Sequence, residues 1–169
     1  VKNHSPANWM TRGHRAIILL RDPRDAAVSL FFMLNAGKNR RFSGDIHELI
    51  RHPRYGFPAF FRQYKSWQND LILTLKYESL REDPFREFTR LLHTLNINAN
   101  DDAVHRAIEK STMTSMRRAQ EQSPKVRQRF RKDFQFARKG STGEWRDFLN
   151  AEDLRYWENL RIQHAFDVY

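Results

Sequence analysis

Two groups of cationic side chains have the composition of an anion-binding site. Arg21 follows an apolar run and directly precedes a helical pattern that carries Ser29. A helix N-terminus presents free N–H groups and a positive dipole end to a phosphate or sulfate, and Arg adds a planar bidentate donor. Far downstream, Arg138 and Lys139 precede Gly140, whose backbone can approach a ligand closely. The two groups together predict a phosphate site formed by distant parts of the chain.

Each group also has a purely structural interpretation. Arg21 could pair with Asp25 at the surface, and Ser29 could hydrogen-bond to the backbone of its own helix. The segment that begins at Arg138 could be a solvated basic loop. Short motifs carry a false-positive risk, so neither group is decisive alone.

His4, with Lys2 close to it in the sequence, is the candidate catalytic pair. A neutral His can take a proton from an attacking hydroxyl, and a Lys can neutralise charge on a group in transfer. A lone His near a chain end more often has no such role. Tyr77, which follows a second apolar run, could stack on a nucleobase or pack at a sheet edge.

The apolar pattern predicts the elements that position these side chains. Residues 15–20 and 71–77 have the pattern of buried strands. The polar, Lys- and Arg-rich stretch 117–139 is interpreted as a loop or as a segment that its ligand orders. Helices are predicted elsewhere: from Asp22 as N-cap to about Asn35 with Gly37 as the stop, then 44–51, 57–68, 84–95, 101–110 with Asp101 as the cap, and 151–166.

Strands that alternate with helices predict the α/β class, with a parallel sheet flanked by helices in a single domain over residues 1–169. Ligands of such sheets bind at the carboxyl ends of the strands. Arg21 and Tyr77 both follow a predicted strand directly. We therefore expect the two side chains at one edge of the sheet.

The composition limits the classes of function. A formal net charge of +10 favours anionic partners: a small anion, nucleic acid or an acidic membrane surface. The chain has no Cys, which excludes disulfides, thiolate catalysis and Cys-based metal sites. The His spacing suggests no metal site, and no apolar run is long enough to span a membrane. We expect a cytoplasmic protein, because a sequence without Cys fits a reducing compartment.

Four segments, in this order, resemble motifs of the cytosolic-type sulfotransferase family. Lys2-Asn3-His4-Ser5-Pro6 resembles K-T-H-x-P, and Arg21 through Ser29 resembles R-N-P-K-D-x-A-V-S. The segment from Tyr77 to Pro84 resembles Y-E-D-x-x-x-D-P, and the segment from Arg138 to Trp145 resembles R-K-G-x-x-G-D-W. Four matches in the family's order favour this identification over the separate structural interpretations.

The resemblance implies the P-loop-type sulfotransferase fold and the donor 3′-phosphoadenosine 5′-phosphosulfate, with no metal. The sulfuryl group would pass to a hydroxyl or amine of a small-molecule acceptor. The resemblance implies that His4 is the general base and that Lys2 stabilises the transferring sulfuryl group. The implied ligands of the 3′-phosphate are Arg21, Ser29, Arg138, Lys139 and the Gly140 backbone. Tyr77 would contact the adenine, as would Met113, through a weak match of Ser111-Thr112-Met113 to the family's T-S-F.

The sequence departs from the family at one point. The family begins with a strand, loop and helix of the type P-K-S-G-T-x-W, which binds the 5′-phosphosulfate, and nothing here matches it. We expect an N-terminally incomplete fold, which leaves open whether this chain is active alone. The alternatives are a non-catalytic nucleotide-binding domain and a basic nucleic-acid-binding domain, the latter disfavoured because the cations fall on expected phosphate-ligand positions. Oligomeric state and acceptor are not encoded in any recognisable motif.

Overall fold

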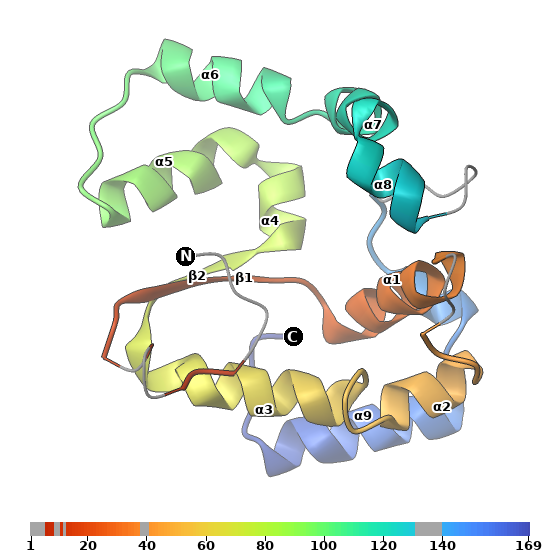
Figure 1. The fold of residues 1–169 in the computed structure, drawn as a ribbon. Helices are drawn as coiled ribbons and strands as arrows, with labels where there is room; N and C mark the ends of the chain where they lie inside the picture. The colour runs from red at the N-terminus through yellow and green to blue at the C-terminus, as the bar shows by residue number, and fades with distance from the viewer. Residues whose placement is uncertain (1–5, 9–10, 12, 38–40, 131–139) are drawn as a thin grey trace.

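A two-stranded parallel sheet lies between two groups of helices (Figure 1). The computed structural model describes residues 6–8, 11, 13–37, 41–130 and 140–169. Strand β1 (Ala16–Leu20) pairs with β2 (Leu71–Lys76), and the pairing runs from Ala16 opposite Leu71 to Leu20 opposite Lys76. The carboxyl ends of the strands therefore lie side by side, which confirms the predicted parallel α/β arrangement.

The turn after β1 is capped as the sequence predicts. The Asp22 carboxylate accepts a hydrogen bond from the Arg24 backbone amide, and Pro23 stands at the first position of helix α1 (Pro23–Ala36). Proline suits this position because its nitrogen has no hydrogen to leave unpaired. Gly37 follows the last residue of α1. The helix therefore starts and stops at residues whose local preferences are visible in the sequence.

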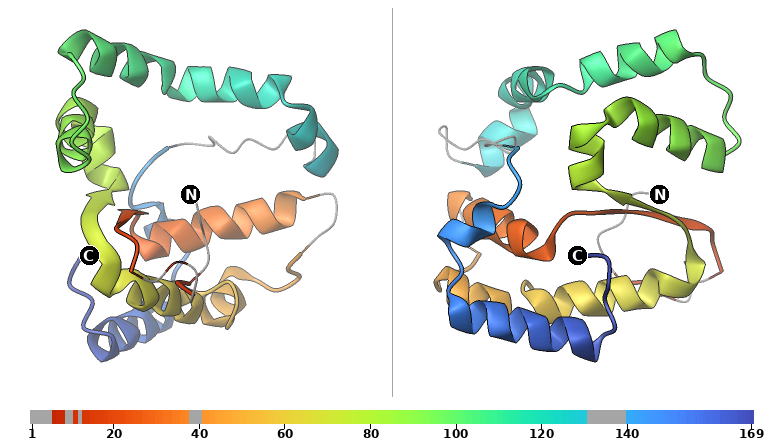
Figure 2. Two further views of the ribbon diagram at one scale, coloured as in Figure 1. Left: turned by 60° about the vertical axis from the view of Figure 1, so that its left-hand side comes forward. Right: turned by 180° about the vertical axis from the view of Figure 1, so that it is seen from behind.

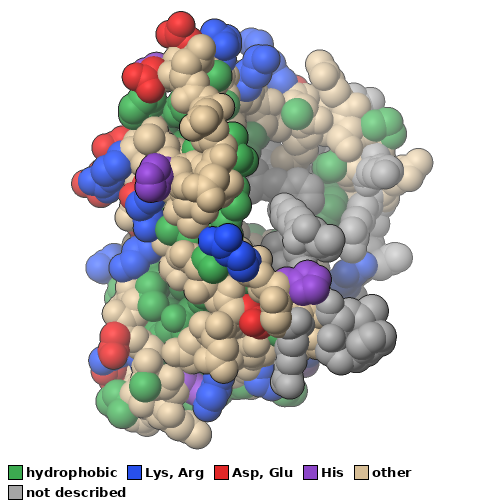
Figure 3. Space-filling model, turned by 90° about the vertical axis from the view of Figure 1, so that its left-hand side faces the viewer, with side chains coloured by type: hydrophobic (Ala, Val, Ile, Leu, Met, Phe, Trp, Pro, Cys, Tyr) green, Lys and Arg blue, Asp and Glu red, His purple; other side chains and the backbone are tan. Residues whose placement is uncertain are grey.

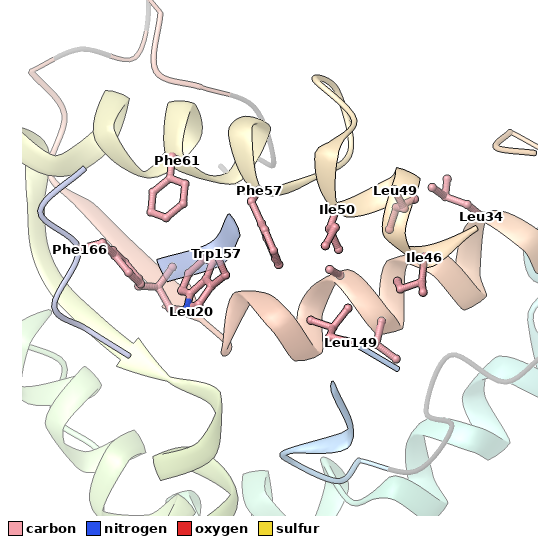
Figure 4. Packing of buried hydrophobic residues seen from close by; sticks show 12 residues of the cluster. Leu20, Leu34, Ile46, Leu49, Ile50, Phe57, Phe61, Leu149, Trp157 and Phe166 are labelled. Atoms are coloured by element: carbon pink, nitrogen blue, oxygen red, sulfur yellow. The ribbon is translucent and has the colours of Figure 1, made fainter. Parts of the chain in front are cut away.

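The hydrophobic core lies on one side of the sheet, between α1 and the helices α2 (Ile46–Arg51), α3 (Phe57–Trp67) and α9 (Ala151–Gln163). The large rings meet at its centre: the Phe61 and Trp157 centroids are 5.4 Å apart, and those of Phe57 and Trp157 are 5.0 Å apart. Burial of rings of this size is a major source of stability. Figure 4 shows these side chains with the others that pack against them: Leu20, Leu34, Ile46, Leu49, Ile50, Leu149 and Phe166.

The other side of the sheet carries a succession of helices that returns toward α1 (Figure 2). These are α4 (Tyr77–Glu82), α5 (Pro84–Thr94), α6 (Asp101–Lys110), α7 (Met113–Gln122) and α8 (Pro124–Arg129). Two 3₁₀ turns complete the described elements, η1 (Gln68–Asp70) before β2 and η2 (Glu144–Asp147) before α9. No described helix is both long and apolar enough to serve as a membrane span.

The structure corrects four element predictions. Tyr77 begins α4 rather than ending a strand. Asn100, not Asp101, caps α6, because its side-chain oxygen accepts the Ala103 amide hydrogen. The predicted loop 117–139 contains helix up to 129, begun by the Thr112 cap and by Pro124, and its residues 131–139 lie outside the described part. The last helix ends at 163, before a left-handed residue, Ala165 with φ 48°, that turns the chain back to the core.

Candidate functional site

Arg21 and Tyr77 lie together where β1 and β2 end. The Arg21 guanidinium carbon is 5.0 Å from the centroid of the Tyr77 ring, a distance typical of a cation–π contact. Arg21 Nη2 donates a hydrogen bond of 2.9 Å to the Ser141 carbonyl, and its Nε is buried with no acceptor among the described residues. The predicted meeting of these two side chains is confirmed, and the segment that begins at Gly140 joins them.

Gly140 packs closely against two of the predicted ligand-binding residues. The Tyr77 hydroxyl donates a long hydrogen bond of 3.4 Å to the Gly140 carbonyl. A Cβ at position 140 would lie 3.2 Å from the Met113 methyl and sulfur, and Gly140 has a φ of 66°. Both the contact and the backbone angle favour glycine here. We call Arg21, Tyr77, Met113 and Gly140 the strand-end cluster.

Asp25 holds the chain that follows this cluster. Its carboxylate accepts the backbone N–H groups of Gly143, at 2.6 Å, and of Trp145, at 2.9 Å. The predicted alternative of a surface pair between Arg21 and Asp25 is therefore wrong, because the Asp25 carboxylate is buried and occupied by these two amides. The sequence gives no signal for the contact beyond an acidic residue in the first turn of α1.

A second acidic side chain, Glu78, ties the strand ends to the end of the chain. Glu78 accepts hydrogen bonds from the Asp22 backbone amide, at 3.0 Å, and from the Tyr169 hydroxyl. Burial, together with the carboxylate of Glu78, raises the pKa of Tyr169, so its hydroxyl stays protonated and acts as a donor. Neither Glu78 nor Tyr169 was expected from the sequence to have a role at the site.

These carboxylates border a cavity of about 230 Å³ beside the strand-end cluster. Each acidic side chain in it already accepts protein hydrogen bonds, which accounts for the burial of Asp22 and Asp25. In the part of the chain that the structure describes, no group of three or more acidic or His side chains could hold a metal ion. The cavity is lined by Asp22, Asp25, Glu78, Thr142, Gly143, Trp145, Arg146 and Tyr169.

The other predicted site residues are not members of the strand-end cluster or lie outside the described structure. Ser29 is exposed on α1. Lys2, His4, Arg138 and Lys139 lie outside the described residues, so their positions remain predictions. On the face drawn in Figure 3, basic and acidic side chains are interspersed. The positive net charge is thus not gathered into one basic patch on that face.

Comparison with known proteins identifies the family. Residues 1–163 match the family model described as the sulfotransferase domain. The chain is 27% identical over 162 residues to Sulfotransferase 1E1 of Homo sapiens, an alignment that covers 86% of this chain and 53% of that protein. It is 25% identical over 212 residues to the glycolipid sulfotransferase of Mycobacterium bovis (strain BCG / Pasteur 1173P2), covering 95% of this chain and 64% of the relative. The chain thus spans a little over half the length of these relatives.

Solved structures show the same fold. Mouse sulfotransferase SULT7A1 complexed with PAP superposes with a TM-score of 0.72 at 18% identity, covering 92% of this chain and 59% of that one. Retinol dehydratase in complex with androsterone and inactive cofactor PAP superposes with a TM-score of 0.73 at 21% identity, covering 89% and 47%. The parallel strands flanked by helices are therefore those of the α/β sulfotransferase fold. With a family match along nearly its whole length and the family's fold, this chain belongs to the sulfotransferase domain family.

Proposed function

We propose that this chain binds 3′-phosphoadenosine 5′-phosphosulfate and belongs to an enzyme that transfers the sulfuryl group to a hydroxyl or amine of a small molecule. The observation that carries the proposal is the strand-end cluster. Segments that begin at residues 21, 77, 113 and 140 converge, and these are the positions where the family resemblance expects contacts with the 3′-phosphate and the adenine.

The cluster has the chemistry that a nucleotide 3′-phosphate requires. The Arg21 guanidinium keeps donor groups beyond the one bonded to Ser141, and charge-assisted bonds from Arg to phosphate are among the strongest hydrogen bonds in proteins. The ring of Tyr77 and the thioether of Met113 supply soft apolar surface for a base. We propose that Ser29, Arg138, Lys139 and the Gly140 amide complete the phosphate site.

The transfer step needs a base and a cation more than a covalent intermediate. A bond forms between the acceptor oxygen or nitrogen and sulfur, the bond from sulfur to the 5′-phosphate oxygen breaks, and 3′-phosphoadenosine 5′-phosphate leaves. By analogy with phosphoryl transfer, such an in-line displacement depends on positioning and on electrostatic stabilisation. We propose that His4 takes the acceptor's proton and that Lys2 stabilises the negative charge on the transferring group.

The acceptor class rests on the relatives. The retinol dehydratase structure contains androsterone, a small molecule with a hydroxyl group, which supports a small hydroxyl-bearing acceptor for this protein as well. We also propose a cytoplasmic location, consistent with a sequence that contains no Cys.

Calorimetric titration with 3′-phosphoadenosine 5′-phosphate tests the proposal. Arg21→Ala should raise Kd by about tenfold or more, since a hydrogen bond to a charged group contributes roughly 1.5–3 kcal/mol. Arg54→Ala is the matched control, because Arg54 is an exposed Arg that also lies over a Tyr ring, that of Tyr55, and should leave Kd unchanged. An unchanged Kd in Arg21→Ala would contradict the assignment of the site.

Two further measurements separate the proposal from its alternatives. Binding of single-stranded oligonucleotides without binding of 3′-phosphoadenosine 5′-phosphate would favour a nucleic-acid-binding domain. Transfer from labelled donor tests catalysis: His4→Ala should lower turnover by about 10²–10⁴-fold, the usual contribution of a general base, and leave nucleotide affinity intact. Nucleotide binding without any turnover in the unaltered chain would favour the non-catalytic alternative.

A further inference from the structure

Asp25 is a buried charge that the proposed reaction does not use. Its side chain lies in the first turn of α1, and the residue is 1% exposed. A carboxylate in such a position is costly to bury unless its oxygens are hydrogen-bonded. Here each oxygen accepts a different backbone amide, Oδ2 from Gly143 and Oδ1 from Trp145. The charge is thus used to bind one peptide segment.

This segment is also the one that contributes to the strand-end cluster. Its carbonyls at Gly140 and Ser141 accept hydrogen bonds from Tyr77 and Arg21, three and two residues before Gly143, the first residue whose amide Asp25 accepts. Gly143, with a left-handed φ of 80°, is the N-cap residue directly before the 3₁₀ turn η2. Residues 140–145 are therefore fastened at two points, first by the strand ends and then by α1.

Contacts of the Trp145 ring also hold this segment against α1. The Arg24 guanidinium carbon lies 4.1 Å from the centroid of the Trp145 ring, and Arg146 lies 4.4 Å from it. Arg24 is in turn paired with the N-cap carboxylate of Asp22 at 2.7 Å. Trp145 is thereby held through its amide by Asp25 and through its ring by Arg24. Both contacts come from the first turn of α1, four residues or fewer from Arg21.

We propose that Asp25 is a positioning residue for nucleotide binding: it fixes residues 140–145 against α1, so that the Gly140 backbone meets the same phosphate as Arg21. The proposal rests on the proposed function and adds a residue to it that touches no nucleotide. Its consequence is that a substitution of Asp25 lowers nucleotide affinity by releasing the segment, although every nucleotide-contacting side chain is still present.

The test compares two buried carboxylates. Asp25→Asn keeps the shape of the side chain but replaces one acceptor oxygen with an N–H donor, which faces a backbone N–H. Asp153→Asn is the matched control: Asp153 occupies the same third position of a helix, is 0% exposed, and lies on the α9 side of the core. Calorimetry with 3′-phosphoadenosine 5′-phosphate and thermal unfolding are measured for each. We expect Kd to rise about tenfold in Asp25→Asn and to stay within twofold in Asp153→Asn, while both unfold at a lower temperature.

A second variant changes the backbone of the segment instead of Asp25. Gly143→Ala leaves Asp25 intact but places a methyl group on a backbone with φ of 80°, where the new Cβ would meet the Arg146 guanidinium. It should also raise Kd several-fold, because the backbone must shift to relieve the strain.

The outcomes are distinguishable. Nucleotide binding by the unaltered chain, with Kd unchanged in both Asp25→Asn and Gly143→Ala, would overturn the positioning role and leave the proposed function standing. An equal loss of affinity in Asp153→Asn would show a general effect of stability and would also overturn it. An unaltered chain that binds no nucleotide would overturn the proposed function and this proposal together.

Discussion

Two buried aspartates connect distant parts of this chain, and their partners differ in kind. Asp25 joins α1 to residues 118 and 120 positions later, and both partners are backbone amides. Asp153 joins α9 to α2 through side chains, with Arg51 Nη1 at 2.5 Å and His47 Nδ1 at 2.5 Å. Each is the third residue of its helix, where a negative charge is favoured by the helix dipole.

This difference in partners distinguishes a carboxylate that positions a backbone segment from a carboxylate that pairs with side chains. Backbone amides do not titrate, and they fix the path of the peptide segment that carries them. Arg51 instead brings a charge and His47 a ring nitrogen to the carboxylate, and both leave the backbone of α2 to its own helical hydrogen bonds. Burial by itself would raise the pKa of Asp153, but the hydrogen bonds from Arg51, from the Asn150 backbone and from His47 outweigh it and hold the pKa below its usual range.

The largest expected effect is on stability, at the Asp153 side of the comparison. Asp153→Ala removes the shared acceptor of Arg51 and His47 and leaves them without their buried partner. We expect the free energy of unfolding to fall by about 2 kcal/mol, because hydrogen bonds to a charged group are lost while the partly exposed Arg51 and His47 can be solvated. Urea unfolding followed by circular dichroism measures the change. A loss below about 1 kcal/mol would mean that the pair is no more than a surface ion pair in effect.

The pH dependence of stability tests the ion pair of Asp153 directly. Because the folded-state pKa of Asp153 is lowered, its contribution to stability is fully present above the unfolded-state pKa of about 3.9 and is lost as pH falls through the folded-state pKa. The stability difference between the unaltered chain and Asp153→Asn should therefore be largest near neutral pH and shrink below about pH 4. Thermal unfolding of both proteins from pH 7 to pH 3 gives the curve. A difference that grows on acidification would contradict the ion-pair account.

The smallest expected effect falls beside Asp25. Arg24→Ala removes one of the two cations at the Trp145 ring and the ion pair with the Asp22 cap, yet leaves both amide hydrogen bonds of Asp25 in place. We expect a stability loss of about 1 kcal/mol, since a cation–π contact and a partly exposed ion pair are each modest. Nucleotide Kd should change less than in Asp25→Asn. A larger change in Kd would show that the ring contact, rather than the amide pair, holds the segment.

Much of the fold was predictable because its signals are local. The strand before Arg21, the Asp22 cap with Pro23 and the stop at Gly37 each depend on residues within one or two turns. The meeting of Arg21 with Tyr77 followed from topology, since parallel strands end at the same edge. The helices α7 and α8 were missed because dense Lys and Arg concealed the start signals at Thr112 and Pro124.

The hydrogen-bond partners of the acidic residues could not be predicted from the sequence. Asp25, Glu78 and Asp153 look alike in the sequence, as carboxylates near helix starts. A carboxylate accepts hydrogen bonds from any nearby donor, so its role depends on which donor the chain's path brings to it. One interpretation of the sequence paired Asp25 with Arg21 at the surface, whereas in the structure its carboxylate accepts two backbone amides from the segment before α9.

Residue types and their order along the chain were enough to predict the family and the class of fold, which the comparisons confirm, because motifs, caps and charge are local properties. Three contacts were visible only in the tertiary structure. Asp25 accepts hydrogen bonds from the segment that follows Gly140, Glu78 accepts one from the Tyr169 hydroxyl, and Asp153 pairs with Arg51 of α2. Each of these contacts joins residues about 90 to 120 positions apart. Such pairs depend on the hydrophobic core that brings the helices together.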